Sequence, residues 1–157
     1  MLRKVILESP FAPGSRPVLG VDTFFSEEAN VDYARRCLHD SLLRGEAPLA
    51  SHLLYTQPGV LDDTIPEERA LGIEAGLVWG DTAEATVVYL DHGVSRGMVF
   101  GVERAAREGR PVEFRVLQGT LTRDAWMARL HAMHHSEPVR ALVDRYRAVR
   151  ADVATAA

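Results

Sequence analysis

The chain has 157 residues, of which 46% are hydrophobic and 25% are charged, as in a single globular domain, and this argues against intrinsic disorder. No apolar run reaches the roughly 18 residues that a membrane span requires. The 18 basic and 22 acidic residues give a net charge of −4, which disfavours duplex nucleic acid as a partner but not a single nucleotide.

The first part of the chain predicts a strand, a loop and a helix. Residues 5–7 are a short apolar run that Pro10 ends, which predicts a buried strand. Residues 11–28 contain several prolines and glycines and predict a long loop, either functional or a plain surface excursion. Asn30 is suited to cap a helix that reaches about Arg44 and buries a stripe formed by Val31, Ala34, Leu38 and Leu42.

The next segments continue this alternation of strands and helices. Residues 48–55 predict a second strand. Pro66 is suited to the first turn of a helix over residues 66–80, with the apolar stripe Ala70, Ile73 and Leu77. Residues 86–90 are β-branched and uninterrupted, as expected for a strand that is covered on both faces.

The last third predicts one more strand and three more helices. A helix over residues 94–108 is followed by a strand over 112–117, and residues 121–152 predict two helices hinged near Pro138. This order predicts an α/β fold, a three-layer Rossmann- or flavodoxin-like parallel sheet of four or five strands. We expect residues 1–120 to form the α/β domain and residues 121–157 to be a C-terminal helical extension of the same domain.

Ligands of such sheets bind beyond the carboxyl ends of the strands. The residues predicted at these ends are Ser9, Pro10 and Phe11 after the first strand, His52, Tyr55 and Gln57 at the second, and Asp91, Gly93, Ser95, Gly97 and Met98 after the third. Gln57 could read the edge of a base, and Tyr55 could stack on a base or hold a phosphate. Ordinary turn chemistry is the alternative explanation for both.

Residues 91–98 form a polar, glycine-bearing loop that opens a helix. Free backbone N–H groups at such a place attract anions, and Asp91 at its rim is suited to bind a sugar hydroxyl or to act as an acid or base. Alternatively, Asp91 only ends the strand and Ser95 only caps the helix. The loop matches neither a Walker A motif nor G-x-G-x-x-G, and we expect no cofactor.

Two polar clusters have a metal site as their less favoured interpretation. The acidic run Asp62-Asp63 and Glu67-Glu68 is more typical of the first turn of a helix. The histidines His131, His134 and His135 have a zinc-like spacing, but no cysteine or carboxylate supports them. We therefore expect no metal.

The motifs together resemble the nucleoside 2-deoxyribosyltransferase-like superfamily, particularly its small uncharacterised members from phages and actinobacteria. The resemblance covers about residues 4–117. It rests on the segment VILESPF, Asn30 with Tyr33-Ala34, Gly45-x-x-Pro48-x-x-Ser51-His52, Leu61-Asp62-Asp63, Pro66-x-x-Arg69-x-x-Gly72, residues 83–89, Gly93-x-Ser95-x-Gly97-Met98, and Gly109-Arg110-Pro111-Val112.

The resemblance implies a pocket for a nucleoside or nucleotide. In the characterised enzymes, a glutamate on a helix attacks the anomeric carbon and displaces the base. Here the position of that nucleophile falls on Gly101, which has no side chain. Glu103 should point away from the pocket and pair with Arg107, and the family's aspartate before the third strand is Glu84.

Two other carboxylates are candidates for the missing function. Asp91 matches the aspartate that follows the family's third strand. Glu8 lies near the pocket end of a predicted central strand, where a buried charge needs a partner. A carboxyl group placed there could have a raised pKa and act as acid or base, or it could simply bond to a neighbouring loop.

Three functions fit the sequence. The first is cleavage or transfer at the N-glycosidic bond of a nucleoside or nucleotide, with Asp91 and Glu8 as catalytic residues. The second is non-catalytic nucleotide binding by a sensor or sequestering protein, which is suggested by the missing nucleophilic side chain at Gly101. The third is an oligomeric interaction protein, whose subunits meet through an apolar seam of Trp126, Met127, Leu130 and Met133, although packing of these residues on their own sheet is the favoured alternative.

The expected partners and location follow from the same observations. Family members often pair subunits so that a neighbour completes each pocket, so the resemblance implies a homodimer or larger homo-oligomer. Cys37, the only cysteine, excludes an internal disulfide and favours a reducing compartment. The first ten residues have too short an apolar core for a secretory signal. We therefore expect a cytoplasmic protein.

Overall fold

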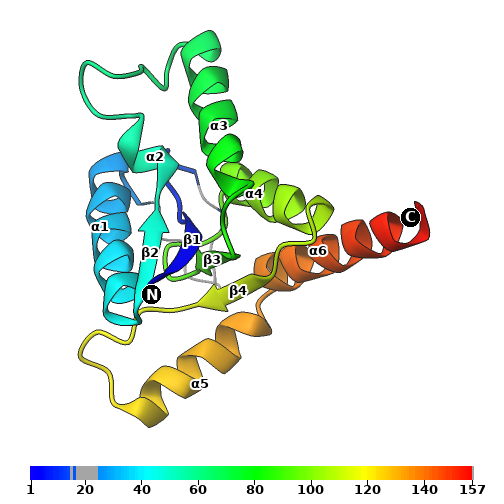
Figure 1. Ribbon diagram of the computed structural model, residues 1–157. Coiled ribbons are helices and arrows are strands. Elements are labelled where there is room, and N and C mark those ends of the chain that lie inside the picture. The colour runs from blue at the N-terminus through cyan, green and yellow to red at the C-terminus, as the bar shows by residue number, and fades with distance from the viewer. Residues whose placement is uncertain (15, 17–24, 157) are drawn as a thin grey trace.

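The computed structural model describes residues 1–14, 16 and 25–156. In this part of the chain, strands alternate with helices (Figure 1). The strands are β1 (Arg3–Glu8), β2 (Glu46–Leu49), β3 (Ala85–Tyr89) and β4 (Val112–Arg115). The helices are α1 (Glu27–Leu43), α2 (Ser51–Leu54), α3 (Pro66–Gly80), α4 (Arg96–Arg107), α5 (Arg123–His134) and α6 (Glu137–Ala156).

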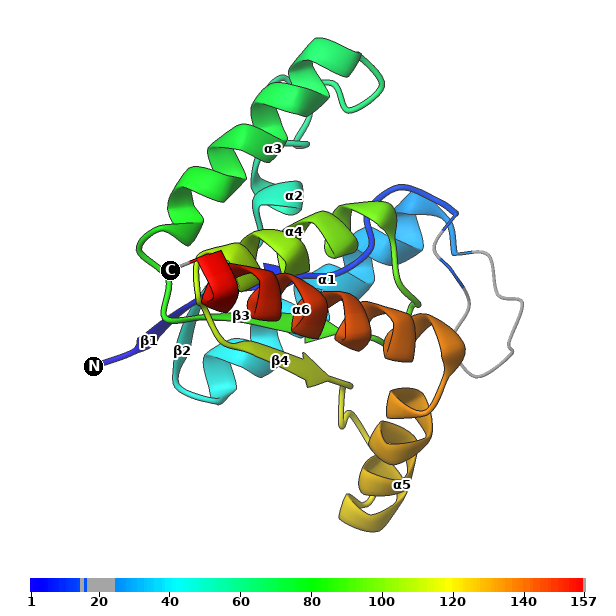
Figure 2. The same cartoon turned by 90° about the vertical axis from the view of Figure 1, so that its right-hand side faces the viewer.

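The four strands form one parallel sheet in the order β2-β1-β3-β4. Helix α1 covers one face, and α4 and α6 cover the other (Figures 1 and 2), which confirms the predicted three-layer α/β fold. From β1 the chain moves first to β2 on one side and later to β3 on the other. Connections therefore diverge at the carboxyl ends of β1 and β3, where ligands of such sheets bind.

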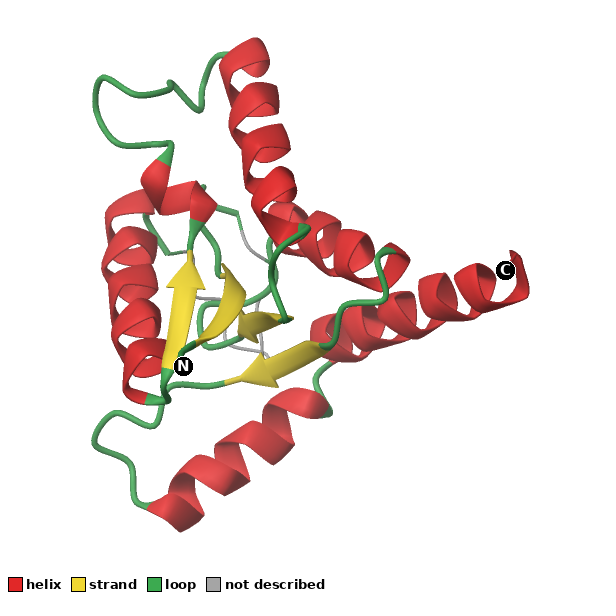
Figure 3. Ribbon diagram, viewed as in Figure 1, coloured by secondary structure: helices red, strands yellow, loops and turns green. Residues whose placement is uncertain are grey.

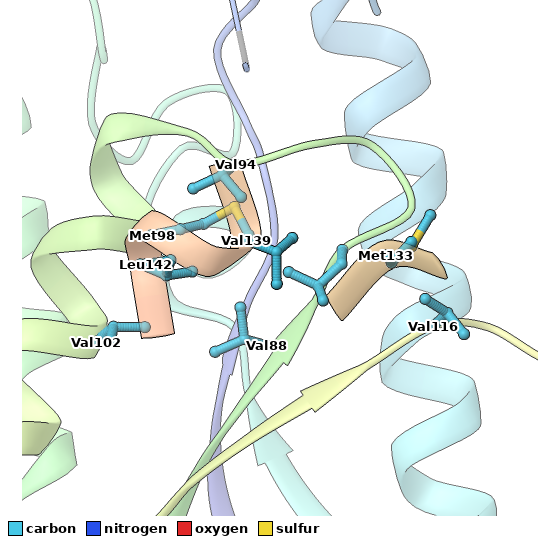
Figure 4. Packing of buried hydrophobic residues seen from close by; sticks show 9 residues of the cluster. Val88, Val94, Met98, Val102, Val116, Met133, Val139 and Leu142 are labelled. Carbon is cyan, nitrogen blue, oxygen red and sulfur yellow. The ribbon is translucent and has the colours of Figure 1, made fainter. Parts of the chain in front are cut away.

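The alternation of side chains along each strand separates two cores. On the face that α1 covers, Val5 and Leu7 of β1 pack with Tyr33, Cys37, Ala50, Ala85, Val87 and Tyr89. On the opposite face, Val88 packs with Met98 and Val102 of α4 and with residues of the last two helices (Figure 4). Ile6 and Glu8 of β1 point to this second face, because they alternate with Val5 and Leu7.

The two C-terminal helices pack on the second core. Met133 of α5 and Val139 and Leu142 of α6 belong to it (Figure 4). The Trp126 indole N–H donates to the Val116 carbonyl at 2.9 Å. Of the four residues predicted for a seam between subunits, Trp126, Leu130 and Met133 thus pack within the chain, while Met127 remains 48% exposed. The homo-oligomer and the proposed division of the chain at residue 120 stay predictions.

The predicted second strand is wrong in its bounds. Strand β2 ends at Leu49, and residues 51–54 form the short helix α2 (Figure 3). Pro48 was expected to begin the strand but lies inside it, at the edge of the sheet, where its missing N–H costs no ladder bond. His52 and Tyr55 consequently lie on and just after a helical turn rather than at the end of a strand.

The predicted start of the first helix is also wrong. The cap is Ser26, whose hydroxyl accepts from the Ala29 N–H at 3.2 Å. Asn30 is buried inside α1, and its side-chain amide donates to the Phe11 carbonyl at 3.0 Å. The buried face of α1 comprises Asn30, Tyr33, Ala34, Cys37 and Ser41, so the predicted stripe is misaligned, and Leu42 is 53% exposed.

The remaining predicted elements are confirmed to within a few residues, including Pro66 at the start of α3 and the break between α5 and α6. Much of the predicted loop over residues 11–28 lies outside the described residues. Its Arg16 exchanges backbone hydrogen bonds with Val94 at 2.9 and 3.1 Å. Among the described helices, none combines the length and apolar composition that would let it cross a bilayer.

Candidate functional site

A cavity of about 500 Å³ lies over the face of β1 that carries Ile6 and Glu8, with walls from α2, α3 and the first half of α4. It lies at the carboxyl end of β1, as the sheet topology predicts. Eight of the predicted site residues line it, namely Glu8, Ser9, Phe11, His52, Tyr55, Ser95, Gly97 and Met98. The cavity therefore joins residues from three separate segments of the sequence.

The Glu8 carboxylate lies directly against Gly101 of α4. A Cβ atom built on Gly101 would stand 2.0 Å from Glu8 Oε1 and 2.5 Å from Glu8 Cδ. Such distances are far below van der Waals contact, so a side chain at residue 101 and the observed Glu8 carboxylate exclude each other. The absence of a side chain at Gly101 thus makes room for the Glu8 carboxylate.

Burial controls the protonation of Glu8. Desolvation raises the pKa of this carboxyl group to about 8, although the nearby Arg110 guanidinium acts in the opposite direction. Arg110 donates to the Thr86 hydroxyl at 3.0 Å and to the Gly80 carbonyl at 2.6 Å, and it forms an ion pair with Glu108. Its charge is therefore largely satisfied by other groups. No hydrogen bond or ion pair within residues 1–14, 16 and 25–156 reaches the Glu8 carboxylate.

Ser9 and His52 form a second polar pair in the cavity. Ser9 Oγ lies 2.8 Å from His52 Nε2, and Ser9 is only 4% exposed. Burial lowers the pKa of His52 to about 4, so the imidazole is neutral at physiological pH. The pair joins the end of β1 to α2.

The sequence prediction missed the wall that α3 contributes. Gly72, Gly76 and Gly80 line the cavity at four-residue spacing, which places them on one helix face. A Cβ atom on Gly76 would stand 2.5 Å from Ser51 Oγ, so α3 approaches α2 closely. The recurrence of glycine every fourth residue was visible in the sequence. The predicted apolar stripe of Ala70, Ile73 and Leu77 is wrong, because Ala70 and Ile73 are exposed and the buried residues of α3 are Gly76 and Gly80.

Ser95 caps a helix and also lies in the wall of the cavity. Its hydroxyl accepts from the Met98 N–H at 3.3 Å, and its own N–H donates to Met98 Sδ at 3.3 Å, so Ser95 caps α4. Ser95, Gly97 and Met98 also line the cavity. The amino end of α4, with its positive dipole, therefore faces the candidate site.

Asp91 lies apart from these groups. Its Oδ2 accepts from the Tyr33 hydroxyl at 2.6 Å and from the Leu117 N–H at 3.0 Å, and Oδ1 pairs with Arg129 at 3.2 Å. Asp91 is not among the residues that line the cavity. Its carboxylate instead links α1, the end of β4 and α5.

Three other predicted site residues are also not among those that line the cavity. Gln57 donates to the Leu54 carbonyl at 3.1 Å and lines a separate hollow beside α1 and β2. Pro10 is buried, and Gly93 has a φ of 86° in the turn after β3. The structure thus does not bring together the base-reading set that was expected after the second strand.

The other polar groups singled out in the sequence have ordinary partners, although Asp63, Glu68 and Arg69 also line the cavity. Asp63 pairs with Arg69, and the Asp62 carboxylate accepts from the Thr64 N–H at 2.9 Å. Glu103 pairs with Arg107 and Arg145, which confirms the predicted pairing with Arg107. Within the described part of the chain, no three His, Cys, Asp or Glu side chains are grouped closely enough to hold a metal ion.

A double-mutant cycle tests the contact between Glu8 and Gly101. In a Glu8→Ala background, Gly101→Ala should stabilise the protein by about 0.5–1 kcal/mol, because alanine favours a helix over glycine. With Glu8 present, the gain should shrink or reverse, because the new methyl group displaces the carboxylate. Urea unfolding of the four proteins measures this coupling. Equal effects in both backgrounds would contradict the contact.

A second variant tests the structural role of Asp91. Asp91→Asn should lower the free energy of unfolding by about 1–3 kcal/mol, because it removes the charge that faces Arg129 and one acceptor of a buried network. The chemistry of the cavity should not depend on it. A loss of stability in urea is expected; unchanged stability together with a loss of ligand binding would instead place Asp91 in the site.

Three comparisons relate the chain to known proteins. A family model described as a domain of unknown function (DUF7768) matches residues 3–115. Curated proteins give no match. Among solved structures, the chain is similar to a 2-deoxyribosyltransferase from the psychrotolerant bacterium Bacillus psychrosaccharolyticus, with 21% sequence identity, a TM-score of 0.48, and coverage of 78% of this chain and 81% of that chain. Because the family model spans most of its length, the chain belongs to the DUF7768 family.

Proposed function

We propose that the cavity binds a nucleoside or nucleotide and that Glu8 acts on its N-glycosidic bond. The observation that carries this proposal is the position of the Glu8 carboxylate, which fills the space that a side chain at Gly101 would need. The sequence resemblance assigns the nucleophilic glutamate to residue 101. A carboxylate is therefore present at that place in the cavity, but it comes from β1 instead of α4.

The cavity suits such a ligand in size and polarity. A volume of about 500 Å³ is within the usual range for pockets that bind small molecules. Phe11, Tyr55 and Met98 supply apolar or aromatic surface for a base, and Glu8, Ser9 and His52 supply polar groups. A phosphate on the ligand would be favoured by the amino end of α4, where Arg96 also lines the cavity.

The proposed reaction uses the ionised form of Glu8. One carboxylate oxygen bonds to the anomeric carbon as the bond from that carbon to the base nitrogen breaks. The base leaves with the electron pair and takes up a proton from water. Water or a second base then displaces the carboxylate and completes hydrolysis or transfer. Because burial favours the protonated acid, the charged sugar of the transition state would stabilise the carboxylate more than the empty cavity does.

A panel of nucleosides and nucleotides tests the proposal. Chromatography of the free bases should show release from at least one member, and Glu8→Gln should reduce the rate at least ~100-fold because the amide is a poor nucleophile. Asp91→Asn, chosen because it lies off the cavity, is the matched control and should retain turnover. Tight binding of a nucleotide without release of base would instead support a sensor or sequestering protein and exclude the glycosidic reaction.

The pH dependence of turnover gives a separate test. The reaction needs ionised Glu8, whose pKa burial raises to about 8. Below that value the rate should therefore rise about tenfold per pH unit, and it should level off above it. Initial rates of base release between pH 5 and pH 9.5 measure this profile. A rate that falls over the same interval would show that the protonated acid is the active form, contrary to the proposed nucleophile.

A further inference from the structure

The pair formed by Ser9 and His52 is independent of the chemistry proposed for Glu8. Glu8 points to Gly101, whereas the next residue, Ser9, turns to α2 and contacts His52 Nε2 at 2.8 Å. Both residues line the cavity. A hydroxyl and an imidazole at this distance have the geometry of a nucleophile and its general base.

The protonation of the imidazole fits this interpretation. Burial lowers the pKa of His52 to about 4, so the ring is neutral at physiological pH, and in the tautomer protonated at Nδ1 its Nε2 can accept the Ser9 proton. Ser9 is 4% exposed and lines the cavity, so its hydroxyl is held in place beside the imidazole. The Thr56 hydroxyl bonds to the His52 carbonyl and thereby holds the helical turn that carries the imidazole.

The surroundings of the pair can accommodate an electrophile. Ser9 directly follows the last residue of β1, so its hydroxyl is placed at the ligand-binding edge of the sheet. The first residues of α4, Arg96 and Gly97, line the same cavity. Backbone N–H groups in the first turn of a helix lack partners inside the helix and can stabilise a developing oxyanion.

We propose that Ser9 is a nucleophile activated by His52 and that the cavity accepts a small carboxylic ester. Ser9 Oγ bonds to the ester carbonyl carbon while its proton moves to His52 Nε2. The bond from that carbon to the leaving oxygen then breaks, and the departing alcohol takes the proton from His52. Water next attacks the acyl-serine and gives its proton to His52, which returns a proton to Ser9 Oγ as the carboxylic acid leaves.

Covalent labelling tests this proposal without any nucleoside. The full chain is incubated with phenylmethylsulfonyl fluoride, and the product is analysed by intact mass and by peptide mapping. We expect one equivalent of label on Ser9, none in Ser9→Ala, and a labelling rate at least ~100-fold lower in His52→Gln, the usual range for loss of a general base. His39→Gln, an exposed histidine on α1, is the matched control and should label like the natural protein.

A second variant tests the pair independently, in case Ser9→Ala does not fold. Ser9→Cys should be alkylated by iodoacetamide faster with His52 present than in the Ser9→Cys/His52→Gln protein, because the neutral imidazole can accept the thiol proton during the attack. The natural Cys37 is buried, and burial raises the pKa of its thiol, so it should react slowly. Circular dichroism checks the fold of each variant.

Two outcomes would overturn the proposal. One is a correctly folded protein in which Ser9 is not labelled and Ser9→Cys reacts no faster with His52 than without it. The other is labelling of Ser9 at a rate that His52→Gln leaves unchanged, which would make the pair a structural hydrogen bond. Neither result depends on release of a base from nucleosides, so failure of this proposal and failure of the glycosidic proposal are distinguishable.

Discussion

The candidate site depends on one steric constraint, which is that the Glu8 carboxylate and a side chain at residue 101 need the same volume. Only glycine at position 101 is compatible with the carboxyl group where it lies. Among the residues that the structure describes, none forms the salt bridge that a buried acid usually has with this carboxyl group, because the nearby Arg110 is engaged by Thr86, Gly80 and Glu108. The result is a largely buried acid whose pKa is raised to about 8 and which faces an open cavity. Such a group is costly for the stability of the fold and is characteristic of functional sites.

The fold places this acid by simple geometry. Side chains alternate along β1, so Val5 and Leu7 enter the core under α1, and Ile6 and Glu8 face α3 and α4. The sheet order then puts the end of β1 at the point where the connections diverge. The glycines of α3 and the amino end of α4 form the walls of the cavity, and the glycines let α3 lie close to α2. Residue 8 therefore reaches the cavity because of its position along β1. Asp91 instead bonds to Tyr33 of α1 and pairs with Arg129 of α5.

Much of the fold could be predicted from the sequence because its signals are local. The β-branched run of β3, Pro66 at the start of α3 and the break near Pro138 each act through the backbone of a few residues. The start of α1 could not be predicted from Asn30, because Ser26 is an equally good cap, and the tertiary contacts of Asn30 with Phe11 and His92 decide between them. Residues 51–54 look apolar enough for a strand but form a helical turn after the edge strand β2.

The site was only partly predictable for a related reason. Residues next to strand ends, such as Glu8, Ser9 and Ser95, line the cavity, and their position could be predicted because the strand-end rule needs only the chain order. Their chemical roles stay predictions. Asp91 and Gln57 follow the same rule but lie elsewhere, because the direction of a side chain in a turn depends on the partners that it finds. The contact between Glu8 and Gly101 joins residues 93 positions apart in the sequence, and no local pattern reports it.

The most direct measurement of the central claim is a crystal structure of the protein with a nucleoside analogue that cannot be cleaved. The analogue should occupy the cavity between α3 and α4, with its anomeric carbon in van der Waals contact with a Glu8 carboxylate oxygen, at about 3–3.5 Å. A complex in which the sugar lies away from Glu8, or in which the analogue binds outside this cavity, would contradict the role assigned to that carboxylate.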